Sequence, residues 1–135
     1  MMLLPFMNQK PTVIVVTQSG AVHNLIKRLL EIENYDVISP KLGLLAEAVH
    51  QAMSDNRNVV LAIVDCDMLE KDLPPNALVA TLRTALQKPD LPYFLISNDP
   101  QPGLMLFKPF TSQEFLATVR LSIELAATKR VAQTT

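Results

Sequence analysis

The chain of 135 residues has one cysteine, no tryptophan and no marked excess of either charge, with a formal net charge of −1. A single cysteine excludes an internal disulfide and suits a reducing compartment. No Lys/Arg cluster forms a basic stripe, so neither a nucleic-acid partner nor a membrane surface is expected. No apolar run reaches the roughly 18 residues of a membrane span. These absences predict a cytoplasmic protein.

What the sequence does contain is enough apolar residues, 49% of the total, to build one compact core. We expect a single domain over residues 12–127, preceded by an apolar N-terminal extension at 1–11 and followed by a frayed tail at 128–135. The extension lacks a basic lead and a small-residue cleavage site, so it is not interpreted as a signal peptide.

The most informative stretch is Val59–Asp65, six apolar residues that run directly into a carboxylate. A short run that is apolar on both faces is typical of a central strand of a parallel sheet with helices on both sides. Asp65 then stands at the carboxyl end of that strand, where ligands and chemistry collect in open α/β sheets. Asp65 is therefore the first candidate functional residue.

The rest of the chain alternates between strand-like and helix-like patterns. The pattern predicts strands at 12–16, 35–39, 59–65, 93–96 and 104–107, and helices at 22–33, 44–53, 76–86 and 111–127. Asn34 is expected to cap the first helix in the left-handed conformation, and Thr111 and Glu114 form a capping box for the last. The two prolines and one glycine in 98–103 exclude a helix there. This alternation predicts a parallel doubly wound sheet with right-handed crossovers.

With the strands in this order, the chain resembles the receiver domain of two-component response regulators. Asp65 ends the third strand, where the family has its phosphoacceptor. Ser97 ends the fourth strand like the family's hydroxyl residue, and Lys108, followed by Pro109, ends the fifth like its invariant lysine. The resemblance implies a flavodoxin-like α/β fold with strand order 2-1-3-4-5. It also implies phosphate-sensing roles for Ser97 and Lys108.

The chain departs from the family at the metal site. Receivers carry two adjacent acidic residues after the first strand, and here those positions hold Thr17 and Gln18. Mg²⁺ is held by carboxylates together with phosphoryl oxygens, and it neutralises charge as a phosphoryl group approaches the acceptor. Asp67 is a partial substitute, although receivers use the backbone carbonyl of that position. We therefore expect no metal or other cofactor, with Mg²⁺ required only if Asp65 is phosphorylated.

A second departure lies between Ser97 and Lys108, which are eleven positions apart, about half the family's usual spacing. The fourth helix has no room, so we expect it to be missing or replaced by a loop. Large exposed apolar patches usually mark partner sites. Without that helix, residues of the last two strands are expected to face water unless residues 1–7 or another subunit cover them. The candidate partner surface comprises Phe94, Ile96, Leu104, Met105 and Leu106.

The preferred hypothesis is a degenerate receiver, of pseudo-receiver type, that acts as a protein–protein interaction module in bacterial signal transduction. Its partner would be a histidine kinase, an output protein or a second copy of the chain. No nucleophile–base pair is visible, so enzymatic activity is not expected. Within signalling, the alternative is a receiver phosphorylated at Asp65. The structural alternative is a simple ion pair between Asp65 and Lys108, favoured by the missing acidic pair.

An alternative from another class is a small flavodoxin-like phosphate- or flavin-binding protein that uses the loop Thr17–Gly20, between a strand and a helix. A plain polar turn is the competing interpretation. Tyr35 and Tyr93 lie in expected strands, and without tryptophan nothing is obviously available to sandwich a flavin ring. Cys66 is interpreted as a small buried filler rather than a redox centre.

Overall fold

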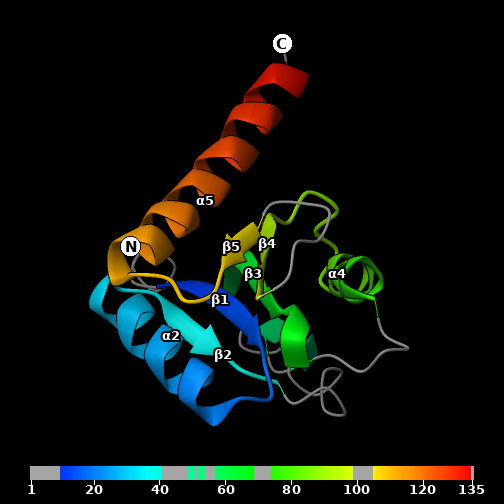
Figure 1. Cartoon of the computed structure of the whole chain (residues 1–135). Coiled ribbons are helices and arrows are strands. Elements are labelled where there is room, and N and C mark those ends of the chain that lie inside the picture. Colours follow the sequence, from blue (N-terminus) through cyan, green and yellow to red (C-terminus); the bar gives the residue numbers. More distant parts are fainter. Residues whose placement is uncertain are drawn as a thin grey trace, which may run out of the picture.

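The sheet is the centre of the computed structural model, which describes residues 10–40, 49–50, 52–53, 57–68, 74–98 and 105–134, without the side chains of 68, 105 and 129–134. Five parallel strands are hydrogen-bonded in the order β2-β1-β3-β4-β5, which confirms the expected topology (Figure 1). The strands are β1 (Pro11–Val16), β2 (Asp36–Ile38), β3 (Asn58–Asp65), β4 (Tyr93–Ser97) and β5 (Met105–Phe107).

Helices cover both faces of the sheet, as a parallel sheet requires (Figure 1). Two of them, α2 (Gly20–Ile32) and α5 (Ser112–Thr134), pack on one face, and α4 (Pro75–Ala85) packs on the other. A short 3₁₀ turn, η2 (Cys66–Met68), follows β3 directly. None of the helices in the described ranges is long and apolar enough to cross a membrane.

The helix ends follow the local sequence signals. The Oγ of Ser19 accepts a hydrogen bond from the backbone N–H of Val22 and so caps α2. Asn34, just past the end of α2, has a φ of 67°, the expected left-handed conformation. At α5, the N–H of Thr111 donates to Glu114 Oε1 and the N–H of Glu114 donates to Thr111 Oγ1, both at 3.0 Å. The predicted capping box is confirmed.

Two sequence predictions differ from the structure or lie outside it. The tail expected from residue 128 is helical instead, because α5 continues to Thr134 and projects past the sheet (Figure 1). Residues 128–134 contain good helix formers such as alanine, lysine and arginine, which favour that continuation. Most of the expected helix 44–53 and the extension at 1–9 lie outside the described residues.

The connection between β4 and β5 is short. Only residues 98–104 separate Ser97 from Met105, so the fourth helix of a doubly wound receiver is missing, as expected. Of these seven residues, 99–104 lie outside the described part of the chain. The consequence is a sheet whose last strand joins its neighbour without a covering crossover helix.

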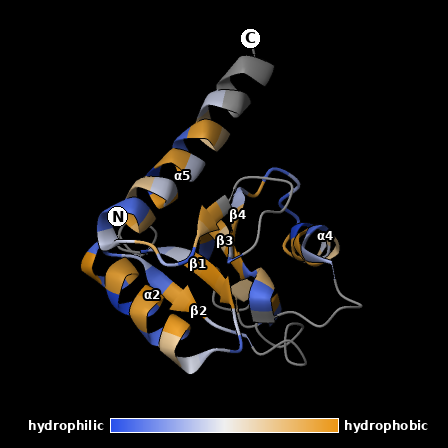
Figure 2. Ribbon diagram, viewed as in Figure 1, coloured by the Kyte–Doolittle hydropathy of each residue, from blue (hydrophilic) through white to orange (hydrophobic). Residues whose placement is uncertain are grey.

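The core has two halves, one on each face of the sheet, and Figure 2 shows the largely hydrophobic strands between the helices. β3 contributes to both, because Leu61 and Ile63 face α2 and α5, whereas Ala62 and Val64 face α4. All four side chains are fully buried. This confirms that β3 is a central strand with two covered faces.

The expected partner surface is wrong for the residues that the structure describes. Phe94 and Ile96 are 0% exposed and Leu106 is 7% exposed, and all three pack in the core half beneath α2 and α5. The Phe94 ring lies edge-on to Phe115 of α5, with 6.1 Å between centroids. Leu104 lies outside the described residues, as does the side chain of Met105.

The physical reason is the two-residue period of a strand. Ser97 pairs with Phe107, and Ile96 pairs with Leu106, so neighbouring residues of β5 point to opposite faces. The missing helix would cover the α4 face, and on that face Phe107 is 53% exposed. The exposed apolar residue of β5 is therefore Phe107, the neighbour of Leu106, which was expected to be exposed.

Candidate functional site

Asp65 lies at the carboxyl end of β3 and is 1% exposed. The hydroxyl of Thr17, just after β1, donates to Asp65 Oδ2 at 2.8 Å. The ammonium of Lys108 lies 2.8 Å from Asp65 Oδ1, which also accepts the backbone N–H of Asp67 at 3.3 Å. The expected ion pair between Asp65 and Lys108 is confirmed. Both carboxylate oxygens are thus engaged.

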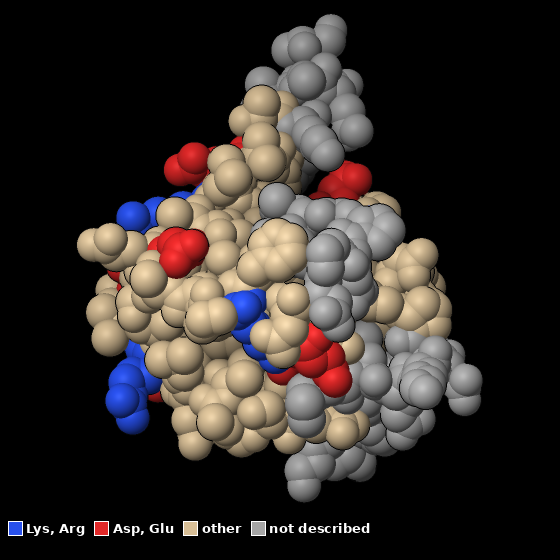
Figure 3. All heavy atoms as spheres, viewed as in Figure 1, with Lys and Arg blue, Asp and Glu red and all other residues tan. Residues whose placement is uncertain are grey.

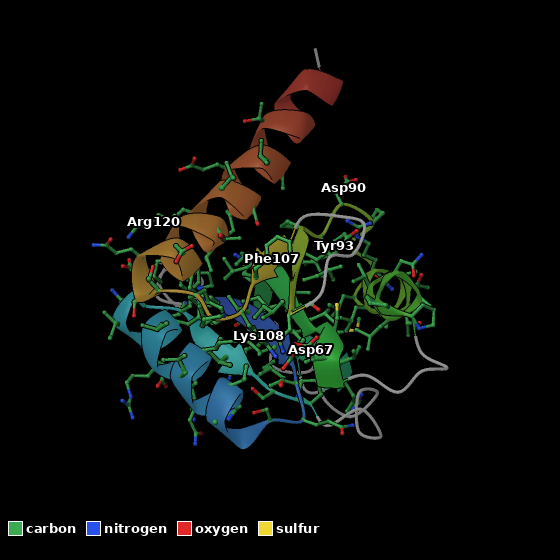
Figure 4. The ribbon with its side chains drawn as sticks, in the orientation of Figure 1. Asp67, Asp90, Tyr93, Phe107, Lys108 and Arg120 are labelled. Atoms are coloured by element: carbon green, nitrogen blue, oxygen red, sulfur yellow. The ribbon has the colours of Figure 1, made fainter. Side chains whose placement is uncertain are left out.

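Asp67, on η2, forms a second carboxylate centre beside the first. Its Oδ1 accepts the hydroxyl of Ser97 at 2.8 Å, and its Oδ2 accepts the backbone N–H of Asn98 at 3.0 Å. The Lys108 ammonium is 3.1 Å from the same Oδ2. Figure 4 shows Asp67 beside Lys108, and in Figure 3 acidic and basic atoms meet near the middle of that face. The ends of β3, β4 and β5 are therefore linked through one side chain.

The charges of this network stabilise one another. Burial alone would raise the pKa of Asp67, but hydrogen bonds from Ser97, Lys108 and Asn98 outweigh it, and the pKa is lowered. Burial likewise opposes the charge of Lys108, yet its bonds to Asp65 and Asp67 raise its pKa above the ordinary value. At neutral pH the network therefore holds an ammonium and an Asp67 carboxylate.

The neighbouring thiol is kept protonated. Burial, followed by the charges of Asp65 and Asp67, raises the pKa of Cys66 to about 11. Since the thiolate is the reactive form of cysteine, this environment disfavours nucleophilic or redox chemistry at neutral pH. The interpretation of Cys66 as a packing residue is consistent with this environment.

The donor set fits Mg²⁺ poorly. Thr17 uses its hydroxyl on Asp65, and Gln18 is exposed, so neither of the positions that are acidic in receivers offers a carboxylate. The Lys108 ammonium lies against both remaining carboxylates, where a cation would meet like charge. Within the described residues, no group of three His, Cys, Asp or Glu side chains is arranged to hold a metal.

The loop Thr17–Gly20 uses its hydroxyl groups internally. Thr17 Oγ1 donates to Asp65 and accepts the N–H of Ser19 at 3.1 Å, whereas Ser19 Oγ caps α2. Tyr93 lies under the guanidinium of Arg83, at 5.3 Å from the ring centroid. These contacts match the interpretation of the loop as a polar turn and give no support to a phosphate- or flavin-binding loop.

The structure brings together Asp65, Ser97 and Lys108, the three residues that carry the sequence resemblance. Sequence reasoning missed the side-chain role of Asp67, which it treated only as a substitute metal ligand. A signal was present, because an acidic residue two positions after the strand end lies near the hydroxyl and ammonium that end β4 and β5. It also missed the direct hydrogen bond from Thr17 to Asp65.

Solved structures similar to this chain share one fold. A chemotaxis protein of Vibrio cholerae, CheY4, matches with a TM-score of 0.67 and 19% identity over 84% of this chain and 98% of its own. The fold is that of a receiver domain. The signal receiver domain of an HD domain-containing protein of Pseudomonas fluorescens Pf-5 has the same receiver fold, with a TM-score of 0.68 and 20% identity over 91% of this chain and 93% of its own.

A third similar structure is a longer protein. NtrX of Brucella abortus matches with a TM-score of 0.70 and 20% identity over 90% of this chain, but over only 29% of its own. No protein-family model and no curated protein sequence matches this chain. At these identities, the likeness establishes the receiver fold.

Proposed function

We propose that this chain is a degenerate receiver domain that serves as a protein–protein interaction module in two-component signal transduction, independent of Mg²⁺-dependent phosphorylation. One observation carries the proposal: Lys108 and Thr17 occupy both oxygens of Asp65, while Thr17 and Gln18 replace the acidic pair. Phosphoryl transfer depends on positive charge that neutralises the incoming group, and metal ions usually supply it. The site lacks the ligands for that ion.

The interaction surface in this proposal is the α4 face at β5, in place of the residues first expected. Phe107 is 53% exposed there. On the same face, a groove of about 580 Å³ is lined by Val79 and Arg83 of α4 and by Tyr93 of β4. Exposed apolar patches usually mark partner sites, and aromatic side chains are frequent anchors of protein partners. A histidine kinase or an output protein is the partner class that fits a receiver.

The alternative within signalling is a receiver phosphorylated at Asp65. It is favoured by the meeting of Asp65, Ser97 and Lys108 at one edge of the sheet, the arrangement that the resemblance implies. The two hypotheses differ in what happens to Asp65 in the presence of a phosphoryl donor.

Acetyl phosphate with Mg²⁺, followed by intact-mass spectrometry, separates the two. We expect wild type to gain no phosphoryl group. A variant with both Thr17→Asp and Gln18→Asp restores the acidic pair, and we expect labelling that disappears when Asp65→Asn is added. A wild type that is labelled as readily as this variant contradicts the proposal.

Binding is tested separately with wild type, Asp65→Asn and Phe107→Asp as baits for proteins of the source cell. We expect Asp65→Asn to capture the same partner as wild type, because the partner does not depend on phosphorylation. Phe107→Asp places a charge on the proposed surface and should lose that partner. Loss of the partner with Asp65→Asn alone would instead favour the phosphorylated receiver.

A further inference from the structure

Three hydrogen-bond donors of different kinds converge on one carboxylate at the edge of the sheet. The hydroxyl of Ser97, the backbone N–H of Asn98 and the ammonium of Lys108 lie 2.8, 3.0 and 3.1 Å from the oxygens of Asp67. A hydroxyl, an amide and an ammonium aimed at one point make an anion-binding set. Ser97 is fully buried, whereas Asp67 is an exposed residue whose side chain is 20% exposed, so the bond from Ser97 is the one best shielded from water.

The anion in this set belongs to the chain itself. Asp67 lies two residues beyond the end of β3, whereas its donors come from the ends of β4 and β5. Asp65 has partners of its own, which are the hydroxyl of Thr17, the ammonium of Lys108 and the backbone N–H of Asp67. Each carboxylate therefore has a separate place in the network.

We propose that the Asp67 carboxylate is a built-in ligand of an anion site formed by Ser97, Asn98 and Lys108. In that place it fixes the two residues to which the family resemblance assigns phosphate sensing. The domain is thereby held in one arrangement without an added phosphoryl group. This inference rests on the proposed function, since a module that works without phosphorylation needs another group to hold Ser97 and Lys108.

Removing the side chain should open the site without leaving a buried cation alone. In Asp67→Ala, the Lys108 ammonium keeps its bond to Asp65 at 2.8 Å, so the strand ends retain one charge pair. The space vacated has the size and donor pattern of a small carboxylate. Formate has the same carboxylate group as the missing side chain and is the natural probe for it.

The experiment compares wild type, Asp67→Ala and Asp90→Ala in sodium formate and in sodium chloride of equal ionic strength. Asp90 is an exposed carboxylate before β4, at the other end of that strand from Ser97 (Figure 4), so its variant controls for lost negative charge. We expect Asp67→Ala to lose about 5 °C in Tm, because hydrogen bonds to a charged group are lost. Formate should restore at least half of that loss and return the Asn98 amide signal toward its wild-type position.

Wild type and Asp90→Ala should respond equally to formate and chloride. The inference is overturned if Asp67→Ala melts like wild type, or if formate acts on it no more than chloride does. If Asp67→Ala does not fold, the wild-type Asn98 amide proton decides. Its chemical shift should change as the Asp67 carboxyl group titrates. A chemical shift that does not change with this titration overturns the inference. A wild type labelled by acetyl phosphate would overturn the proposed function, and that result is independent of formate rescue.

Discussion

The two faces of the sheet differ most clearly at two adjacent residues of β5. Leu106 is 7% exposed beneath α5, whereas Phe107, the next residue, is 53% exposed on the α4 face. α5 covers the first face, whereas the seven residues between β4 and β5 leave no room for a helix that would cover the second face at this edge. At this edge of the sheet Phe107 is thus uncovered, whereas its neighbour Leu106, on the opposite face, stays buried.

Lys108 follows at the point where the two faces meet. Its side chain is 17% exposed and pairs with the carboxylates of Asp65, which ends β3, and of Asp67, in η2. The closed face, this charged junction and the open face should differ in how much each contributes to the free energy of unfolding.

The largest loss of stability is expected for Phe115→Ala, on the face of the sheet that α2 and α5 cover. Phe115 is fully buried, lies edge-on to Phe94 and stacks on Phe110 with 5.6 Å between ring centroids. We expect the free energy of unfolding to fall by about 3–5 kcal/mol, because a large cavity opens under α5. Urea denaturation measures the change. A loss below about 1 kcal/mol would mean that α5 does not close this face.

The next largest loss is expected for Lys108→Met. This substitution removes the cation that pairs with the Asp65 carboxylate, which is 1% exposed in the structure. We expect a loss of about 3 kcal/mol, because breaking a buried ion pair leaves an uncompensated charge. Adding Asp65→Asn removes that charge, so the double variant should recover part of the loss. Equal unfolding free energies for the single and double variants would contradict this explanation.

Acid should weaken the same junction at Asp67. A carboxyl group whose pKa is lowered in the folded state stabilises the protein fully above its unfolded pKa of about 3.9. That contribution is lost as the pH falls through the lowered pKa. We expect Tm of wild type to fall over this acidic range more steeply than Tm of Asp67→Asn. Parallel curves for the two proteins would show that Asp67 is not stabilised in the folded state.

The smallest loss of stability is expected on the α4 face, at the exposed residue Phe107. Phe107→Ser is expected to change the free energy of unfolding by no more than about 0.5 kcal/mol, as for ordinary surface positions. It should also reduce binding of a hydrophobic dye, because it removes an exposed aromatic ring. Phe115→Ala is the matched comparison under α5. A loss at Phe107 similar to that at Phe115 would show that the α4 face is covered in solution.

The resemblance to receivers predicted the strand order. The meeting of Asp65, Ser97 and Lys108 followed from their places at strand ends, because the carboxyl ends of parallel strands share one edge. Sequence reasoning misplaced the exposed residues, because neighbouring residues of β5 face opposite sides of the sheet and the missing helix would cover only one of those sides. Phe94 and Leu106 belong to the α5 side. The side-chain role of Asp67 depends on how η2 turns after β3, so the acidic residue two positions after the strand end indicates that role only once the turn is known.

The central claim is that Asp65 is held by Thr17 and Lys108 rather than prepared for phosphorylation. The most direct measurement is a two-dimensional amide NMR titration with Mg²⁺, followed by Mg²⁺ with beryllofluoride, a mimic of the phosphoryl group. The account predicts that the signals of Asp65, Ser97 and Lys108 stay unchanged at millimolar Mg²⁺ and after beryllofluoride is added. Shifts that spread from Asp65 through Ser97 to Lys108 would show a working phosphoacceptor site and contradict the account.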